Sequence, residues 1–202
     1  MNHAQAHTIA LALVHKFAPY CQHINIGGSL RRNTPESHDI DIVAIPKSEQ
    51  VTADLFGGTT TIYPIQTFIH DGIMAGDWRK IKGAQKYIQL GLPEGINLDL
   101  NLVTPPAQYG VKILLHTGPD TFNHWLVTAR RHGGRMPSNA VMRGGAVYVN
   151  GILVPMPDEI SALTFFLGGW IPPEKREAHW EGQPSTNLGI RENPSTNSCY
   201  TP

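Results

Sequence analysis

Two aspartates separated by one residue lie in an apolar segment of the sequence. Asp39 and Asp41 flank Ile40 in DIDIVAIP, and Asp99 lies in the alternating segment INLDLNLV at residues 96–103. Residues i and i+2 of a β-strand point to the same face, so Asp39 and Asp41 should lie side by side. If the strand that carries Asp99 pairs with theirs, three carboxylates converge. Such carboxylates repel one another unless cations neutralise them, and Mg²⁺ prefers oxygen ligands of this kind.

Residues suited to binding phosphate precede the aspartates, in the segment GGSLRR. The two glycines let backbone amides approach a phosphate closely, Ser29 offers a hydroxyl, and Arg31 and Arg32 offer guanidinium groups for a pyrophosphate. Each feature alone is common, because a D-x-D pair is often solvated and Gly-Gly-Ser often forms only a turn. The ordered set is more specific. It predicts a triphosphate site with two Mg²⁺ ions, or Mn²⁺ in their place, about 3.5–4 Å apart.

Hydrophobic periodicity predicts an α+β fold around these residues. A helix is expected over residues 4–17, and strands are expected at 23–26, 39–45, 59–64, 86–90 and 96–103. Beyond Pro105-Pro106 the pattern predicts helices over 107–116 and 120–132, a hairpin over 146–154 around Asn150-Gly151, and a last helix over 157–167. We therefore expect a mixed sheet with flanking helices, followed by a small α/β lobe. The Ser-, Thr-, Asn- and Pro-rich end of the chain is expected to be disordered.

The composition narrows the class of protein. The chain has 202 residues, 41% of them hydrophobic, which suffices for one well-packed core or two small ones. Sixteen basic and sixteen acidic residues give a net charge of zero, whereas dedicated nucleic-acid binders usually carry a basic excess. Cys21 and Cys199 are too isolated to indicate a disulfide framework or a cysteine metal site. Without a long apolar run or a signal-peptide pattern, we expect a cytoplasmic protein with no membrane association.

The ordered set of motifs resembles the nucleotidyltransferase superfamily that includes DNA polymerase beta. The segment LLHTGPDTFNHWLVTARRHGG, residues 114–134, is similar to the family X DNA polymerases, whose T-G and F-N residues correspond here to Thr117, Gly118, Phe122 and Asn123. The ending DEISALTFFLGGWIPPEKRE resembles the last helix of that family and its P-x-x-R terminus. The resemblance extends over about residues 20–178. It implies a nucleotidyltransferase palm at residues 1–104, a thumb at 105–181 and a disordered tail at 182–202.

The resemblance implies a role for each matching residue. It implies that the catalytic metal ligands are Asp39, Asp41 and Asp99, and that Asp99 also helps to activate a 3′-hydroxyl nucleophile. It implies phosphate contacts from Gly28, Ser29 and Arg32. It places the sugar and base of the nucleotide against a set of residues further along the chain, Leu115, His116, Gly118, Asp120 and Asn123. The family has a cis peptide after the glycine of its T-G pair. We therefore expect a cis bond between Gly118 and Pro119, which the proline makes inexpensive.

The chain also departs from the family pattern. The two arginines that usually flank the third aspartate are Asn97 and Asn101 here, the aromatic pair before T-G is Leu115-His116, and a thumb arginine that contacts the template is Val127. Only 26 residues precede Gly27, so we expect no lyase or fingers domain. Five basic residues and one acid lie between residues 112 and 143. This excess either contacts a nucleic-acid backbone or forms a solvated charged face.

These features lead to one main expectation and two alternatives. The main expectation is a minimal, monomeric family X-like DNA polymerase that adds dNMP from a dNTP to a DNA 3′-hydroxyl during short gap filling in DNA repair. Its hold on a primer-template should be weak and sensitive to salt. The first alternative is a nucleotidyltransferase that uses dNTP or NTP to tail RNA or single-stranded DNA without a template, or that modifies another acceptor. The second, a binding module with a vestigial site, is disfavoured because all three aspartates are present.

Overall fold

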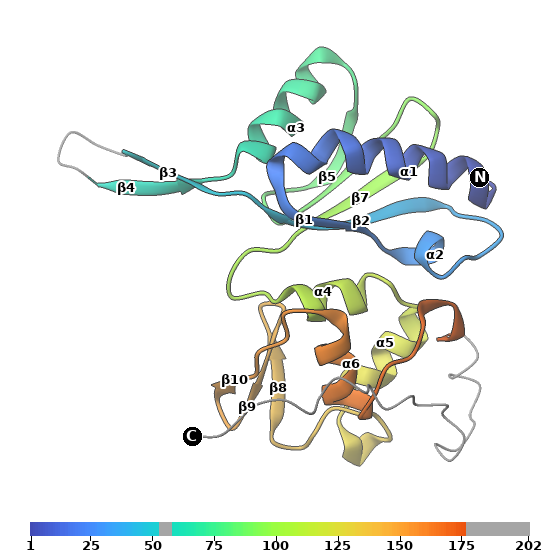
Figure 1. The fold of residues 1–202 in the computed structure, drawn as a ribbon, viewed down its shortest axis with the longest axis vertical. Coiled ribbons are helices and arrows are strands. Elements are labelled where there is room, and N and C mark those ends of the chain that lie inside the picture. Colours follow the sequence, from blue (N-terminus) through green and yellow to red (C-terminus); the bar gives the residue numbers. More distant parts are fainter. Residues whose placement is uncertain (53–57, 177–202) are drawn as a thin grey trace, which may run out of the picture.

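A five-stranded mixed sheet forms the centre of the N-terminal part of the chain. The computed structural model describes residues 1–52 and 58–176, and Figure 1 shows its α+β arrangement. The strands follow the order β1 (Cys21–Ile26), β2 (Asp39–Pro46), β7 (Asn97–Leu102), β6 (Tyr87–Gly91) and β5 (Arg79–Gly83). The pair β2–β7 is parallel, and the other neighbouring pairs are antiparallel. The predicted mixed sheet with flanking helices is therefore confirmed.

Two helices cover one face of this sheet. They are α1 (His3–Phe17) and α3 (Pro64–Ala75), which lie on the same side of the strands in Figure 1. The side chains of Ile40 and Ile42 on β2, and of Leu98 and Leu100 on β7, are fully buried in the cluster that these helices complete. Since alternate residues of a strand face opposite ways, burial of the isoleucines and leucines turns the intervening polar residues to the other face.

Short elements connect the central strands. Helix α2 (Gly28–Arg31) follows β1, and the 3-10 turn Ala18–Tyr20 joins α1 to β1. Strands β3 (Glu49–Thr52) and β4 (Thr59–Ile62) pair with each other as a two-stranded ribbon, which extends away from the sheet in Figure 1.

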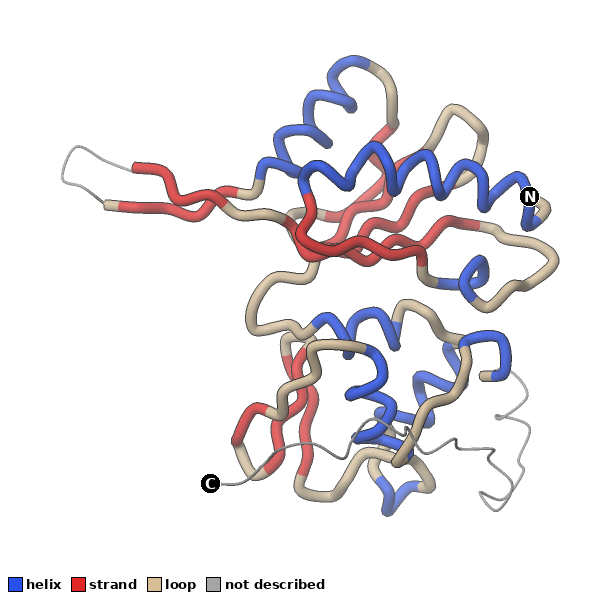
Figure 2. The backbone as a smooth tube through the Cα atoms, in the orientation of Figure 1, coloured by secondary structure: helices blue, strands red, loops and turns tan. Residues whose placement is uncertain are grey.

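The C-terminal elements lie on the other side of the sheet, as Figure 2 shows. They comprise the helices α4 (Tyr109–Leu115), α5 (Asp120–Val127) and α6 (Glu159–Leu167), the 3-10 turns Arg130–His132 and Pro173–Lys175, and the strands β8 (Ala140–Arg143), β9 (Ala146–Val149) and β10 (Ile152–Leu153). A second buried cluster joins the three helices to the small sheet, including Leu114, Phe122, Leu126, Val147 and Phe166.

Helix α4 packs against the polar face of the central sheet. Tyr109 and Ile113 of this helix pack with Val43 and Val103 in a third buried cluster. Val43 lies two residues beyond Asp41, on the same face of β2. Helix α4 therefore brings its C-terminal end, and the connection to α5, close to the aspartate face. The boundary predicted at residues 104 and 105 falls in the connection that leads into this helix.

Two local predictions need correction. The helix predicted over 120–132 ends at Val127, because Thr128 and Ala129 adopt extended backbone angles and the Thr128 hydroxyl donates to the carbonyl of His124 at 2.6 Å. The strand predicted over 59–64 ends at Ile62, and Pro64 begins helix α3. The Gly-Gly-Ser segment leads directly into helix α2, which begins at Gly28. The hairpin is confirmed, with positive φ angles at Asn150 and Gly151.

Three further expectations concern the C-terminal tail, the cysteines and membrane association. The tail predicted at 182–202, with Cys199, lies outside the described residues. Cys21 is a buried free thiol. Among the described helices, none combines the length and the apolar character needed to cross a membrane.

Candidate active site

A pocket of about 550 Å³ lies where the aspartate face of the sheet meets α2 and the connection between α4 and α5. Ten of the residues predicted from the sequence to form the metal and nucleotide site line it: Gly28, Ser29, Arg32, Asp39, Asp41, Asp99, Leu115, His116, Gly118 and Asp120. Asn123 and Arg31, which were also predicted to contribute, are not part of the lining. The lining also contains His38, Thr117 and Pro119, which the sequence analysis had not assigned to the site. Residues separated by up to 92 positions in the chain thus share one pocket.

The parallel pairing of β2 and β7 positions the three carboxylates. Asp41 lies directly opposite Asp99 in the register, and Asp39 lies opposite Asn97. All four side chains belong to the face of the sheet opposite the buried isoleucines and leucines. The pairing that the sequence analysis required for convergence of the aspartates is therefore present.

The carboxylates destabilise one another's charged forms. Burial raises the pKa of Asp41 to about 7, and the nearby charges of Asp39 and Asp99 add to this shift, against a smaller lowering by Arg32. Burial and the charge of Asp99 also raise the pKa of Asp39. An acidic pocket of this kind favours a bound cation, which would replace repulsion with attraction.

The donor atoms of this pocket suit a hard divalent cation. Three carboxylates in one pocket supply the oxygen ligands that Mg²⁺ and Mn²⁺ accept, and the raised pKa of Asp41 reflects its burial beside two other acids. Within residues 1–52 and 58–176, however, no three acidic, histidine or cysteine side chains are gathered closely enough to ligate one ion as they stand. Mutual repulsion is a sufficient physical reason for that separation. The residues therefore fit such an ion by chemistry, and ligation requires the carboxylates to turn toward one another.

The two glycines before the aspartates are required by close packing. A Cβ atom on Gly28 would lie 1.9 Å from Oδ2 of Asp41, and the residue has a φ of +59°. A Cβ atom on Gly27 would lie 2.6 Å from the carbonyl oxygen of His116, which accepts a hydrogen bond from the Gly28 amide at 2.7 Å. The glycines thus allow α2 to lie against both the aspartates and the end of α4.

The side chains of Arg31 and Arg32 lie in different places. The Arg32 side chain lines the pocket and donates from Nη1 to the carbonyl oxygen of Thr117. Arg31, which the sequence analysis placed with Arg32 toward a pyrophosphate, instead points toward the C-terminal elements. It donates to Thr117 Oγ1 at 2.7 Å and to both carboxylate oxygens of Glu159 at 2.8 and 2.5 Å. The prediction for Arg31 is therefore wrong.

Glu159 connects α2 to the C-terminal end of the described chain. Besides its bonds with Arg31, it accepts a hydrogen bond from Nη1 of Arg176 at 2.8 Å. Glu159 is 6% exposed and Arg176 is fully buried. Charged pairs this well buried and hydrogen-bonded are strongly destabilised when one partner is removed. The P-x-x-R segment noticed in the sequence therefore contributes its arginine to a buried ionic cluster beside the pocket.

The remaining wall of the pocket comes from the end of α4. His116 Nε2 accepts a hydrogen bond from Lys112 Nζ at 3.1 Å, and burial, assisted by that lysine, lowers the pKa of His116 to about 4. His116 is therefore neutral at physiological pH. Asn123 donates to the carbonyl oxygen of Leu115 at 2.5 Å, whereas its Oδ1 is buried without a partner among the described residues. The predicted cis bond between Gly118 and Pro119 is confirmed.

Asp99 has a neighbour that no sequence motif indicated. Tyr87 on β6 donates a hydrogen bond from its hydroxyl to Oδ1 of Asp99 at 3.2 Å. The strand prediction over 86–90 contained this residue but assigned it no role. Its alternation with Ile88, which is buried on the helix-covered face, is the signal that could have placed it beside the aspartates.

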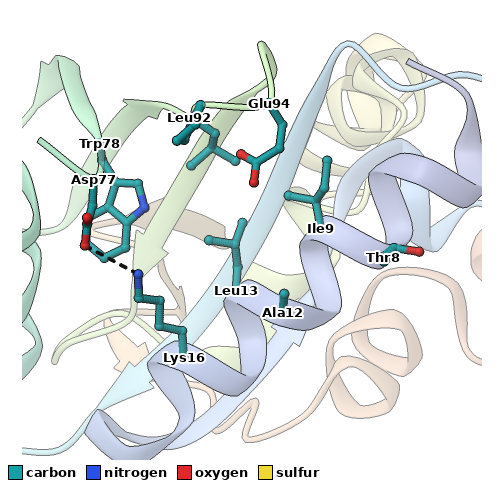
Figure 3. Close-up of a pocket in the computed structure, with 10 residues that line it drawn as sticks. Thr8, Ile9, Ala12, Leu13, Lys16, Asp77, Trp78, Leu92 and Glu94 are labelled. Carbon is teal, nitrogen blue, oxygen red and sulfur yellow. Dashed lines mark ion pairs between the residues drawn. The ribbon is translucent and has the colours of Figure 1, made fainter.

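A second pocket, of about 440 Å³, lies on the helix-covered side of the sheet (Figure 3). It is formed by α1, Trp78 and the turn between β6 and β7. Lys16 pairs with Asp77 at 3.6 Å across it and lies over the Trp78 ring. Its acidic residues, Asp77 and Glu94, are not joined by a phosphate-binding segment. The pocket that contains the three aspartates is therefore the better candidate for chemistry.

Comparisons with known proteins do not identify a family for this chain. The chain matched no model of a known protein family, and a search of curated protein sequences gave no match.

Proposed function

We propose that this protein is a metal-dependent nucleotidyltransferase similar to the family X DNA polymerases, with a palm at residues 1–104 and a thumb at 105–181. In this proposal it adds dNMP from a dNTP to a DNA 3′-hydroxyl and releases pyrophosphate. One observation carries the proposal. Three carboxylates on two paired parallel strands line the same pocket as Ser29 and Arg32, which come from the segment directly before the first of those strands.

Asp39, Asp41 and Asp99 are the residues that would hold the metal ions. Mg²⁺ or Mn²⁺, when bound, supplies positive charge that stabilises the transferring phosphoryl group and makes the acceptor hydroxyl more acidic. The protein contributes the carboxylates and a rigid sheet that keeps two of them opposite each other in register. Since the pKa of Asp41 is about 7 in the metal-free protein, this carboxyl group must lose its proton before it can act as a ligand.

The other pocket residues would bind and orient the nucleotide. Arg32 offers a guanidinium group to the triphosphate, because its side chain already lies in the pocket wall. Ser29 donates its hydroxyl to Ser37 at 2.9 Å, which holds its oxygen in the pocket wall where the phosphates would bind. Leu115, the neutral His116 and Asp120 would border the sugar and base.

Phosphoryl transfer in this site is a single displacement. The acceptor oxygen attacks the α-phosphorus, the bond between that phosphorus and the bridging oxygen breaks, and pyrophosphate leaves. We assign the proton of the acceptor hydroxyl to Asp99, the carboxylate that β7 contributes. Asn123 would act through its hydrogen bond to the Leu115 carbonyl, which fixes one wall of the nucleotide site.

A second candidate function keeps this chemistry and changes the acceptor. Val127 packs against the second hydrophobic cluster, so the position offers no charged group to a template strand. The chain as a whole has no net positive charge. Both facts favour a protein that tails RNA or single-stranded DNA without a template, or that modifies another acceptor, over one that grips duplex DNA.

An extension assay distinguishes these candidates. A labelled primer, alone, annealed to a template or placed at a one-nucleotide gap, is incubated with each dNTP or NTP and with Mg²⁺ or Mn²⁺. Addition directed by the template supports the polymerase, and equal addition to single strands supports the tailing enzyme. The Asp99→Asn variant provides the control and should be inactive. Absence of transfer to every acceptor by a folded wild-type protein would contradict the proposal.

A further inference from the structure

Tyr87 lies on the side of Asp99 that is away from the other aspartates. Strand β7 has β2 on one side and β6 on the other. Asp41 faces Asp99 across the first pairing, and the Tyr87 hydroxyl reaches Oδ1 of Asp99 from across the second, at 3.2 Å. The carboxylate of Asp99 is therefore repelled from one side and bound by a hydrogen-bond donor on the other.

The sheet register explains why this tyrosine reaches the carboxylate. Tyr87 is the direct cross-strand partner of Asn101, and Gln89 is the direct partner of Asp99. The contact between Tyr87 and Asp99 is thus a diagonal one, which an aromatic side chain is long enough to span. Lys82 Nζ also lies over the Tyr87 ring, 5.9 Å from its centroid. The backbone register therefore accounts for the position of the hydroxyl beside Asp99.

The side-chain amide of Asn101, the next polar residue on this face of β7, does not bind the Asp99 carboxylate. Asn101 follows Asp99 by two residues on the same strand face and is 2% exposed. Its Nδ2 has no hydrogen-bond partner within the described part of the chain. Among the described residues on this side of β7, the Tyr87 hydroxyl is consequently the group that binds the carboxylate.

We propose that Tyr87 is a positioning residue that fixes the orientation of the Asp99 carboxylate toward the pocket. This inference rests on the proposed function for its consequence in catalysis, because Asp99 is assigned there as metal ligand and proton acceptor. With Oδ1 bound by the phenol, Oδ2 is the oxygen that remains for a ligand in the pocket. Loss of a partner of this kind leaves the ligand in place and lets it rotate, which typically reduces activity or metal affinity about 10–100-fold.

The Tyr87→Phe variant tests this inference because it removes one oxygen atom and keeps the ring over which Lys82 lies. Tyr109→Phe is the matched control. It removes the same atom, together with a 2.6 Å hydrogen bond from Asn25, at a place outside the pocket. Crystal structures of both metal-free variants and the wild type give the orientation of Asp99. Steady-state kinetics with Mg²⁺ give kcat, and KM for the nucleotide, separately.

We expect the Asp99 carboxylate to rotate or to become disordered in Tyr87→Phe and to stay fixed in Tyr109→Phe. We expect kcat to fall about tenfold or more in Tyr87→Phe, whereas KM for the nucleotide stays within about twofold of wild type. An unchanged Asp99 orientation, or an unchanged kcat, would overturn the inference. If the wild type transfers no nucleotide, the proposed function fails. The crystallographic comparison still decides whether Tyr87 orients Asp99.

Discussion

Replacement of Asp41 by asparagine should stabilise the metal-free protein at alkaline pH. Asp41 lies opposite Asp99 in the parallel register, and burial together with Asp39 and Asp99 raises its pKa from 3.8 to about 7. Asparagine has nearly the same shape but never carries the charge. The substitution therefore removes the cost of ionising this carboxyl group in the folded protein, and it retains the volume of the side chain.

The expected size of the effect follows from the pKa shift of Asp41. A difference of one pKa unit between the folded and unfolded states corresponds to about 1.4 kcal/mol, so a shift of roughly three units sets a ceiling of about 4 kcal/mol. Between about pH 4 and pH 7 the folded state keeps a proton that the unfolded state loses. The wild type therefore loses stability as the pH rises through this window and reaches its full deficit above it.

Urea unfolding followed by tryptophan fluorescence, with a chelator present, measures this difference at pH 4 and pH 8. We expect Asp41→Asn and wild type to be nearly equal at pH 4, and the variant to be more stable by about 2–4 kcal/mol at pH 8. Asp71→Asn, at an exposed position of α3, controls for the loss of one negative charge. Mg²⁺ should stabilise the wild type more than Asp41→Asn, because ligands stabilise the state that binds them.

Equal stability of wild type and Asp41→Asn at pH 8 would refute this reasoning. It would mean that the Asp41 carboxylate is solvated or paired in the folded protein, contrary to its burial beside two other acids. A gain of the same size in Asp71→Asn would attribute the effect to overall charge, with the same consequence.

Two further predictions concern the surroundings of the pocket. Glu159→Gln should lower the free energy of unfolding by about 3–5 kcal/mol in chemical denaturation, because it leaves the fully buried Arg176 and the partly buried Arg31 without their anion; a loss below about 1 kcal/mol would contradict this. Gly28→Ala should be more destabilising than Gly151→Ala in the same measurement. Both glycines have positive φ angles, but only at Gly28 would the new Cβ meet Asp41, and at Gly151 nothing lies within 4 Å. Equal losses would show that backbone strain of about 1–2 kcal/mol explains both.

The sequence predicted the two strands that carry the aspartates because one face of each is buried. Ile40 and Ile42, and Leu98 and Leu100, alternate with polar residues, and this period of two is typical of a half-buried strand. The sequence does not show whether these two strands pair with each other. Their pairing depends on contacts across more than fifty residues, which local periodicity does not encode. The same limitation applies to Arg31, whose partner Glu159 is 128 residues away.

Other elements gave no sequence signal for identifiable reasons. Helix α3 contains Gly72, which lowers helix propensity; the helix needs it because a Cβ there would lie 2.3 Å from the Trp78 ring. Strand β5, RKIKG, is exposed along its whole length, so it lacks the apolar alternation by which strands are recognised. The contact of α3 with Trp78 and the pairing of β5 with β6 are not encoded in an apolar repeat of either segment.

The most direct test of the central claim follows the two ends of the nucleotide triphosphate. The protein is incubated with a DNA primer and Mg²⁺, and with dNTP labelled either at the α- or at the γ-phosphate. Nucleotidyl transfer predicts that the α-label enters the primer and the γ-label appears in pyrophosphate, and that Asp99→Asn abolishes both. Entry of the γ-label into an acceptor, or release of the γ-label as inorganic phosphate with no α-label transferred, would contradict the account.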